Sequence, residues 1–383
     1  DFIKTDWVIR NPGVRADNPF LAIAKKHKIP IDNDVTLFLR LQGGAENVIG
    51  VTGTRGKTTT AHLIHAMIKE EHPRAWLGGN VGRSPLELLS SRASSAAERV
   101  EGSHTDRMRF LASLEMTKSP IILELSSFLL HNFDSIKQSP HIAVITNLYP
   151  DHLNAYPSLQ KYFADKKNIY KYQKRGDFLI INDDDALMKK SVPKTRGTVV
   201  RFSVKRKLPV FPLSDFKLLG EHNIANLLAA VAAAQAYGIS NAAIRRAVKK
   251  FKGVPYRLEL IRTVRGVQYI NDTTATTPEG AIAGLKSFPK KKIILITGGN
   301  SKGLSLLAFA KEIRARAKVV ILLPGNANGE LPKGIPAQDM REAVRIASEN
   351  AQRGDVVLLS PGLSWLPVMN EFERGDEFTK WVR

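Results

Sequence analysis

Short apolar runs recur along this chain of 383 residues, and each is followed by helical spacing or by glycine or proline. Alternation of buried strands with helices is typical of parallel α/β sheets. We therefore predict an α/β fold with mostly parallel sheets. The runs that we expect to be strands are 48–51, 121–125, 142–146, 178–181, 293–296, 319–323 and 356–359.

The segments between these runs predict helices and one linker. Helical spacing covers 57–71, 159–170, 223–237 and 241–251. The segment 251–255 has the glycine and proline of a linker, which predicts a domain boundary there. The polar stretch 90–118 is rich in serine, alanine and arginine, and we expect it to be a surface insertion.

The composition excludes several classes of protein. There are no cysteines, so disulfides, thiolate metal sites and cysteine nucleophiles are excluded. No apolar run reaches the ~18 residues that span a bilayer, and the first residues lack the pattern of a signal peptide. We expect a cytoplasmic enzyme that is a monomer and does not contact a membrane.

The net charge of +21 admits two interpretations, a nucleic-acid surface or a solvated basic surface. The basic clusters are scattered along the chain and lack interleaved aromatic residues. We favour the solvated surface, which would help polyanionic substrates to approach, and we expect no nucleic-acid partner.

A glycine loop, 52–58, joins the first apolar run to the first helix. Backbone N–H groups of such a loop surround a phosphate, and the helix N-terminus adds partial positive charge. Lys57 would reach the terminal phosphates of ATP, and the Thr58 hydroxyl would ligate Mg²⁺. The eight-residue P-loop pattern requires glycine where this chain has Val51, so only a shorter motif remains. Its position between a strand and a helix favours phosphate binding over a chance glycine turn.

Polar side chains follow the next two predicted strands. Glu124 ends one apolar run, and Asp151 and His152 follow another. Carboxyl ends of parallel strands meet at one edge of a sheet, where ligands bind. Singly, Glu124 could be a capping or surface acid and His152 a loop histidine; together they favour a Mg²⁺ site. Residue type alone predicts that Lys166, on the next helix, is exposed.

In these motifs the chain resembles the Mur ligase family. The matching segments occur in one order over nearly the whole chain, which is more specific than any of them singly. The Glu-Leu-Ser-Ser-Phe form of 124–128 is similar to the branch that adds D-glutamate to UDP-N-acetylmuramoyl-L-alanine. The matching segments are 53–59, 79–82, 124–128, 146–152, 220–226, 256–257, 271–276, 298–303 and 359–362.

The resemblance implies an ATP-dependent amide ligase of peptidoglycan precursor synthesis that acts through an acyl phosphate. It implies a remnant of an N-terminal UDP-binding α/β domain at 1–46, a P-loop-type central ATPase domain at 47–253 and a Rossmann-like C-terminal domain at 254–383. Family members open with a whole UDP-binding domain, so we expect this chain to be truncated at its N-terminus. Its UDP-substrate site would then be incomplete.

The resemblance also implies roles for individual residues. The residues that would contact ATP are Gly53, Thr54, Arg55, Gly56, Lys57, Thr58, Thr59, Asn223, Asn226, Arg257 and Asp272. The ligands of two Mg²⁺ ions would be Thr58, Glu124, His152 and Lys166, the last as a carbamate, which turns a lysine into an oxygen ligand. The catalytic residues would be Lys57, Glu124, His152 and Lys166. The residues that would contact the other substrates are Gly13, Asn80, Asp151, Thr276, Lys302 and Ser364.

The chain departs from the family pattern at several positions. Arg55 replaces the usual asparagine of the loop, Tyr256 the usual histidine, and Thr274 the usual lysine. The segment 363–365 is altered as well. Because the lysine at position 274 helps to hold the amino acid in the family, these departures bear on specificity more than on ligase activity.

Two other kinds of function are alternatives to a D-glutamate ligase. A folylpolyglutamate synthase, or another Mur-type ligase with a different amino acid, would share the two C-terminal domains. The 124–128 motif argues against the first. A catalytically silent nucleotide- or nucleic-acid-binding protein would be expected to lack Lys57, Glu124 or His152, and all three are present.

Overall fold

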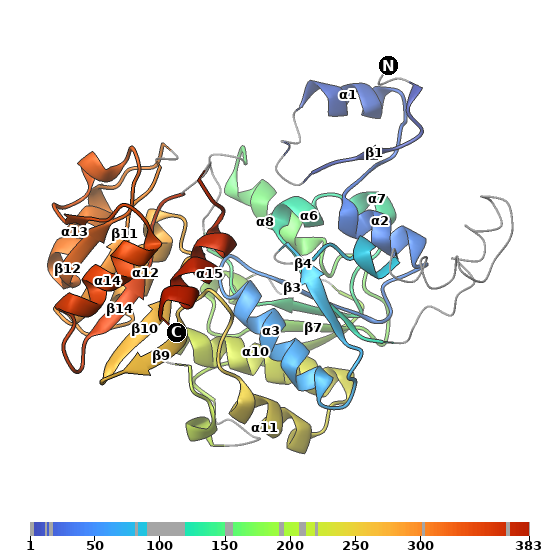
Figure 1. Ribbon diagram of the computed structural model, residues 1–383. Coiled ribbons are helices and arrows are strands. Elements are labelled where there is room, and N and C mark those ends of the chain that lie inside the picture. The colour runs from blue at the N-terminus through green and yellow to red at the C-terminus, as the bar shows by residue number, and fades with distance from the viewer. Residues whose placement is uncertain are drawn as a thin grey trace, which may run out of the picture. The chain divides into compact units, whose positions relative to one another are not determined.

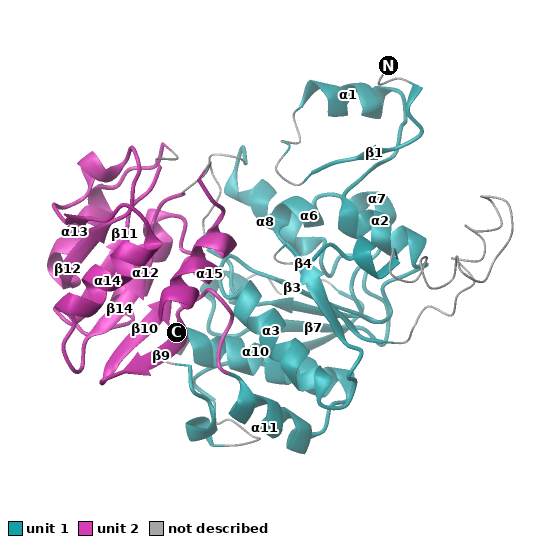
Figure 2. Ribbon diagram, in the orientation of Figure 1, with its two compact units in different colours: residues 1–251 teal, residues 252–383 magenta. Residues whose placement is uncertain are grey.

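The computed structural model describes residues 4–11, 14, 18–80, 83–89, 119–149, 156–190, 195–206, 212–218, 221–300, 303–364 and 368–382. The chain divides into two compact units, residues 1–251 and 252–383, coloured teal and magenta in Figure 2. Each unit is an α/β structure, so the predicted fold class is confirmed. The predicted insertion at 90–118 lies outside the described residues.

A six-stranded parallel sheet forms the centre of the first unit, in the order β4-β5-β3-β6-β7-β8. The four predicted strands of this half are confirmed as β3, β5, β6 and β7. The two edge strands, β4 and β8, were not predicted. The strands are β3 (Val48–Thr52), β4 (Trp76–Gly79), β5 (Ile121–Glu124), β6 (Ile142–Ile145), β7 (Phe178–Asn182) and β8 (Thr198–Phe202).

The strand order reverses at β3. From β3 the chain reaches β4 and β5 on one side of the sheet and then continues through β6, β7 and β8 on the other. All the carboxyl ends lie at one edge because every pair is parallel. In open α/β sheets ligands bind at such a reversal, outside the carboxyl ends of the strands. The glycine loop follows β3 directly, so the topology places it where a ligand is expected.

Helices cover both faces of this sheet (Figure 1). One face carries the helices that follow the glycine loop and end the unit, and the predicted helices there are confirmed to within about two residues at each end. These helices are α3 (Lys57–Lys69), α10 (Glu221–Tyr237) and α11 (Asn241–Lys250). The opposite face carries α2 (Asp34–Leu41), α6 (Ser127–Leu130), α7 (Phe133–Ile136) and α8 (Leu159–Lys167).

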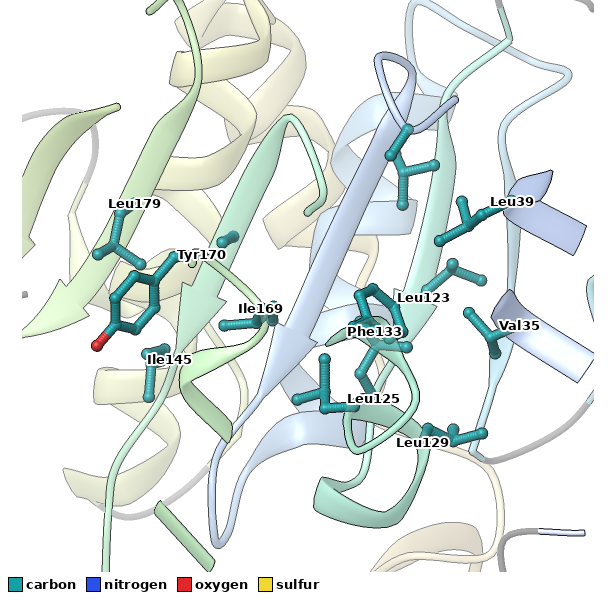
Figure 3. Packing of buried hydrophobic residues seen from close by; sticks show 14 of the residues in the cluster. Val35, Leu39, Leu123, Leu125, Leu129, Phe133, Ile145, Ile169, Tyr170 and Leu179 are labelled. Atoms are coloured by element: carbon teal, nitrogen blue, oxygen red, sulfur yellow. The ribbon is translucent and has the colours of Figure 1, made fainter. Parts of the chain in front are cut away.

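Packing on this second face joins α2 to the sheet. Figure 3 shows Val35 and Leu39 of α2 beside Leu123, Leu125, Leu129 and Phe133 in one buried cluster. Full burial of such a side chain contributes about 1.5–3 kcal/mol. Asn33 caps α2, and its amide also donates to the Leu129 carbonyl at 2.8 Å. The buried side chains of α2 are therefore part of this core.

The remaining N-terminal elements form a small βαβ unit. Strands β1 (Val8–Ile9) and β2 (Ile31–Asp32) pair in parallel, and α1 (Pro19–Lys26) lies between them in the chain. The buried Asp32 carboxylate accepts hydrogen bonds from Trp7 Nε1 at 3.0 Å and Arg40 Nε at 2.9 Å. This unit is thus held by a small apolar cluster and by hydrogen bonds to one buried carboxylate.

The second unit contains a six-stranded sheet in the order β13-β12-β11-β14-β10-β9, in which only β9 runs antiparallel to its neighbour. The three predicted strands of this half are confirmed as β11, β12 and β14. The strands are β9 (Glu259–Val264), β10 (Val267–Asn271), β11 (Ile293–Thr297), β12 (Ala317–Leu322), β13 (Ile335–Pro336) and β14 (Val356–Leu359).

Two apolar clusters, one on each face, join this sheet to its helices. One contains buried residues of α14 and α15, and the other those of α12 and α13. The result is the Rossmann-like layering of helices on both sides of a mostly parallel sheet. The helices are α12 (Pro278–Lys286), α13 (Leu307–Arg316), α14 (Met340–Asn350) and α15 (Glu371–Val382). Nowhere in the described parts of either unit is a helix long and apolar enough to cross a bilayer.

Candidate active site

The glycine loop makes two close approaches that only glycine allows. Gly53 has φ 149° and Gly56 has φ 81°, both in the region that L side chains rarely adopt. A Cβ on Gly53 would lie 2.0 Å from Thr146 Oγ1, and one on Gly56 would lie 2.2 Å from Asn226 Oδ1. The glycines therefore bring the loop backbone against β6 and α10, where a larger residue would push it away.

Two residues after β6 hold this loop in shape. Thr146 Oγ1 donates to the Arg55 carbonyl at 2.6 Å, and Asn147 Nδ2 donates to the same carbonyl at 3.0 Å. The Arg55 N–H donates in turn to Asn147 Oδ1 at 2.9 Å. Arg55 is thus fixed through its backbone, while its side chain is exposed. The sequence shows Thr146 and Asn147 only as part of a motif, because no local pattern indicates which loop they contact.

Lys57 begins α3 and folds back over the loop. Its Nζ donates to the carbonyls of Gly53 at 3.1 Å and Thr54 at 3.0 Å. The first backbone N–H groups of a helix have no partner within the helix, and they carry partial positive charge. The loop, the helix end and the lysine therefore form one positive site, with the partly buried Thr58 and Thr59 on the first turn.

Lys166 lies against the same loop and is buried. It is 3% exposed, so the exposed position that residue type alone predicts is wrong. Its Nζ donates to the Gly53 carbonyl at 2.9 Å and lies 4.8 Å from the centre of the Tyr162 ring. Tyr162 and Lys166 are four residues apart on α8, so both face the loop from one side of that helix.

Tyr162 is a further contact that the sequence analysis did not predict. Its hydroxyl lies 3.2 Å from Thr54 Oγ1, which also accepts from the Tyr149 N–H at 2.9 Å. Tyr156 packs on Tyr162 with ring centres 5.4 Å apart, and burial raises the pKa of the Tyr156 hydroxyl. Burial thus favours the uncharged form of the Tyr156 phenol, which packs beside Tyr162.

Glu124 ends β5 beside the loop and is 3% exposed. It pairs in register with Val51 of β3 on one side and Gly79 of β4 on the other. Asn80 donates its backbone N–H to the Glu124 carbonyl at 2.8 Å and its amide to Oε1 at 3.4 Å. A Cβ on Gly79 would lie 2.4 Å from the Glu124 carbonyl oxygen, which explains a glycine in this edge strand.

The chemistry of these groups fits Mg²⁺. Among the described residues, the buried Glu124 carboxylate has one long side-chain contact, and the first turn after the loop carries a buried threonine hydroxyl, so both groups supply hard oxygens. Within the described ranges no group of three histidine or acidic side chains has the arrangement of a metal site. Asp151 and His152 lie outside those ranges, as do Gly13 and Lys302.

The two asparagines of α10 lie beneath the loop. Asn226 is buried, its Oδ1 lies 3.4 Å from the Thr60 hydroxyl, and its amide donates to Asn223 Oδ1 at 3.3 Å. Because Asn226 also faces Gly56, the structure brings both asparagines to the helix side of the glycine loop.

Arg257 and Asp272 belong to the second unit. Burial raises the pKa of the Asp272 carboxyl to about 7. Hydrogen bonds from the Ser360 hydroxyl at 2.8 Å and the Leu258 N–H at 3.2 Å act in the opposite direction, as does the charge of Arg257. Burial therefore moves the titration of Asp272 from acidic pH toward neutral pH.

Three loops at the carboxyl edge of the second sheet join where Thr276 and Ser364 occur. The Gly362 N–H donates to the Ala275 carbonyl at 2.8 Å, which links the loops after β14 and β10. The Asn300 N–H donates to the Ser364 carbonyl at 2.6 Å, which adds the loop after β11. Thr276 and Ser364 are thus on adjoining loops of one unit.

Comparison with known families matches two domain models to this chain. The Mur ligase middle domain matches residues 51–213, and the glutamate ligase domain of Mur ligases matches residues 256–363. The UDP-N-acetylmuramoylalanine–D-glutamate ligase of Roseiflexus sp. (strain RS-1) is 34% identical over 100% of this chain and 85% of its own length.

Solved structures share the fold at lower identity. UDP-N-acetylmuramate–alanine ligase from Thermotoga maritima has a TM-score of 0.62 and 21% identity, over 98% of this chain and 85% of its own. Mycobacterium tuberculosis folylpolyglutamate synthase, solved with ADP and AMPPCP, also has a TM-score of 0.62, with 16% identity over 91% of this chain and 95% of its own. The fold alone therefore does not separate these activities.

Proposed function

Because this chain belongs to the Mur ligase family, as an ATP-dependent ligase of peptidoglycan precursor synthesis, we propose that it joins D-glutamate to UDP-N-acetylmuramoyl-L-alanine. The observation that carries the proposal is similarity to D-glutamate ligases over the full length of the chain. The geometry of the glycine loop supports the use of ATP. We also propose that the protein is a cytoplasmic monomer.

The site supports a two-step reaction. In the first step, the terminal carboxylate of the UDP substrate attacks the γ-phosphorus of ATP, the bond to the β–γ bridging oxygen breaks, and ADP leaves. In the second, the amine of D-glutamate attacks the acyl carbon, loses a proton, and displaces inorganic phosphate through a tetrahedral intermediate. Lys57, at the end of the loop where α3 begins, would offset the repulsion between the carboxylate and the phosphates.

The metal-binding part of the proposal uses Thr58, Glu124, His152 and a carbamylated Lys166 as ligands of two Mg²⁺ ions. When bound, Mg²⁺ would neutralise charge on the phosphoryl oxygens. Glu124 would keep its carboxylate at the end of β5 through its neighbour Asn80, which we propose also contacts the sugar nucleotide. The remaining proposed ATP contacts are Gly53, Thr54, Arg55, Gly56, Thr59, Asn223, Asn226, Arg257 and Asp272.

The proposed organisation has three parts, with a UDP-domain remnant at 1–46, an ATPase domain at 47–253 and an amino-acid domain at 254–383. In the last part, Thr276, Lys302 and Ser364 would hold the carboxylates of the incoming amino acid. Gly13 and Asp151 complete the set of proposed substrate contacts.

One observation favours a second candidate, a ligase of the same type with another amino acid. Thr274 stands where the family has a lysine, and its hydroxyl donates to the Tyr256 carbonyl at 2.9 Å. Thr274 is thus engaged in holding the preceding loop, and it is too short to act as the lysine would. The choice between the two candidates is one of amino-acid specificity.

Release of phosphate tests the proposal. The protein is incubated with ATP, Mg²⁺ and UDP-N-acetylmuramoyl-L-alanine, and a panel of amino acids including both enantiomers of glutamate is added singly. We expect phosphate release and a new amide product only with D-glutamate. Turnover with a different amino acid supports the second candidate, and no amino-acid-dependent turnover contradicts both. A parallel assay with a folate substrate and L-glutamate checks folylpolyglutamate synthase activity.

A further inference from the structure

Arg374 is the largest fully buried side chain among the described residues, with 1% of it exposed. It lies in the first turns of α15. Burial lowers the pKa of its guanidinium to about 10, although the nearby Glu371 acts in the opposite direction. Removing an arginine from water is costly unless its N–H groups are satisfied, so the surroundings must hold it specifically.

The groups that hold Arg374 are neutral and belong to two loops. Nε donates to Thr273 Oγ1 at 2.9 Å, and Nη2 donates to the Thr273 carbonyl at 2.8 Å. Nη1 donates to the Leu363 carbonyl at 3.4 Å. Thr273 belongs to the loop after β10, and Leu363 to the loop after β14. A planar guanidinium can reach both loops at once, whereas a lysine offers a single nitrogen.

The helix that carries Arg374 is itself fastened to the first of these loops. Thr273 Oγ1 donates to the Glu371 carbonyl at 2.8 Å, and Asn271 Nδ2 donates to the Gly375 carbonyl at 3.0 Å. A Cβ on Gly375 would lie 2.6 Å from Thr273 Cγ2, so the helix approaches the loop as closely as a glycine allows. Because the helix is fastened to the loop after β10, the hydrogen bond from Arg374 to the Leu363 carbonyl adds a second link between that loop and the loop after β14.

These two loops also carry Thr276 and Ser364, which we propose as contacts of the amino acid. Thr276 is three residues after Thr273, and Ser364 follows Leu363 directly. The loops meet through the Gly362 N–H and the Ala275 carbonyl at 2.8 Å. Arg374 therefore contacts both of the loops that carry the two proposed carboxylate contacts.

We propose that Arg374 is a positioning residue for the amino-acid pocket, holding the loops after β10 and β14 at the spacing that a dicarboxylic amino acid requires. This inference rests on the proposed function. It predicts an effect on amino-acid binding and on the second step. Formation of the acyl phosphate depends mainly on the glycine loop of the first unit and should change less than amino-acid binding does, although Asp272 on the loop after β10 is a proposed ATP contact.

The experiment compares Arg374→Lys and Arg374→Met with wild type in the full chain. We expect the KM for D-glutamate to rise about 10- to 100-fold, because small misplacement of binding groups is costly. The KM for ATP and the amount of acyl phosphate trapped by hydroxylamine without amino acid should change much less than the KM for D-glutamate. Arg345→Met is the matched control, since Arg345 forms only exposed contacts with Glu342 and Glu349 among the described residues of α14.

A second pair of variants changes Thr273, the partner of Arg374 in this contact. Thr273→Val removes the hydroxyl that accepts from Nε, and Thr273→Ser keeps it; only the first should raise the KM for D-glutamate. If Arg374→Met does not fold, the Thr273 variants test the positioning role of Arg374 in its place. An unchanged KM in Arg374→Lys and Thr273→Val, or an equal loss of acyl-phosphate formation, overturns the inference. If wild type uses another amino acid, the proposed function fails and the same KM comparison is made with that amino acid.

Discussion

The ammonium groups of Lys57 and Lys166 meet at one atom, the carbonyl oxygen of Gly53, at 3.1 and 2.9 Å. The two lysines come from α3 and α8, on opposite faces of the central sheet (Figure 1). The convergence lies beside a helix N-terminus, and Lys57 together with that helix end makes the loop positive, which favours a polyphosphate there. It also places the lysine proposed to become a carbamate within the same site.

Replacing Lys166 should test that carbamate. Lys166→Ala is expected to lower kcat about 10²- to 10³-fold, since it removes a group that stabilises developing charge. Short carboxylates such as acetate should restore part of the activity by supplying the missing oxygens. Lys167→Ala, at the exposed neighbouring position, is the control. Full activity of Lys166→Ala without added carboxylate, or no carbamate signal from wild type with ¹³C-labelled CO₂ in NMR spectra, would remove the proposed role.

Substitution of Gly56 should separate backbone strain from steric conflict. Gly56→Ala introduces a Cβ at 2.2 Å from Asn226 Oδ1, whereas Gly43, with almost the same φ of 82°, has nothing within 4 Å of a new Cβ. Gly43→Ala should cost about 1 kcal/mol in free energy of unfolding, the usual strain of this conformation. Gly56→Ala should cost more and should weaken ADP binding at least about tenfold. Urea unfolding and ADP titration measure both, and equal effects of the two variants contradict the close approach.

The raised pKa of Asp272 predicts a pH dependence of stability. Its pKa is 3.8 in the reference state and about 7 in the folded protein, so the folded state binds the proton more tightly. The stability that it contributes is fully present below pH 3.8 and is lost as the pH rises to about 7. Relative to Asp272→Asn, wild type should therefore lose Tm between pH 5 and pH 8. A difference in Tm that stays constant over this range contradicts the assignment.

Substitution of Arg257 tests the pKa of the Asp272 carboxyl independently. Its positive charge lowers the pKa of Asp272, against the larger effect of burial. In Arg257→Ala the pKa should rise further, and the loss of Tm should move to higher pH. Arg262→Ala, on the partly exposed strand β9, is the comparison variant.

Restoring a lysine at position 274 should test amino-acid specificity. Thr274→Lys returns the group that the family uses, and it should lower the KM for D-glutamate if that amino acid is the substrate. Thr274→Ala controls for loss of the hydrogen bond to the Tyr256 carbonyl. If the KM for D-glutamate rises equally in both variants, then position 274 acts only through the loop, and the second candidate function gains support.

Local sequence was sufficient to predict a strand where the segment is buried on all sides. The predicted runs at 121–125, 142–146 and 356–359 form central strands. A strand in the middle of a parallel sheet is covered on both faces, so apolar residues are favoured at every position. The edge strands β4 and β8 were missed. One has two glycines and the other a half-exposed side, so their pairing depends on neighbours that are distant in sequence.

The same division applies to the candidate site. The glycine loop at 52–58 and the carboxylate of Glu124 at a strand end are visible in the sequence, since both depend on a strand, a turn and a helix that are contiguous. Tertiary contacts decide three other features. They are the burial of Lys166, the hydrogen bond from the Arg55 N–H to Asn147, and the hydrogen bond from Arg374 to the Leu363 carbonyl. An isolated lysine or arginine has no local pattern that shows its partners.

By itself, the sequence thus determined the fold class, the order of the motifs and the kind of chemistry that a glycine loop and a strand-end acid can perform. Only the tertiary structure decided which side chains surround the Gly53 carbonyl and which arginine connects the loops after β10 and β14. The reason is physical: strands and helices follow from local spacing and burial, whereas the convergence of charged groups depends on strand order and helix packing, which bring distant segments together.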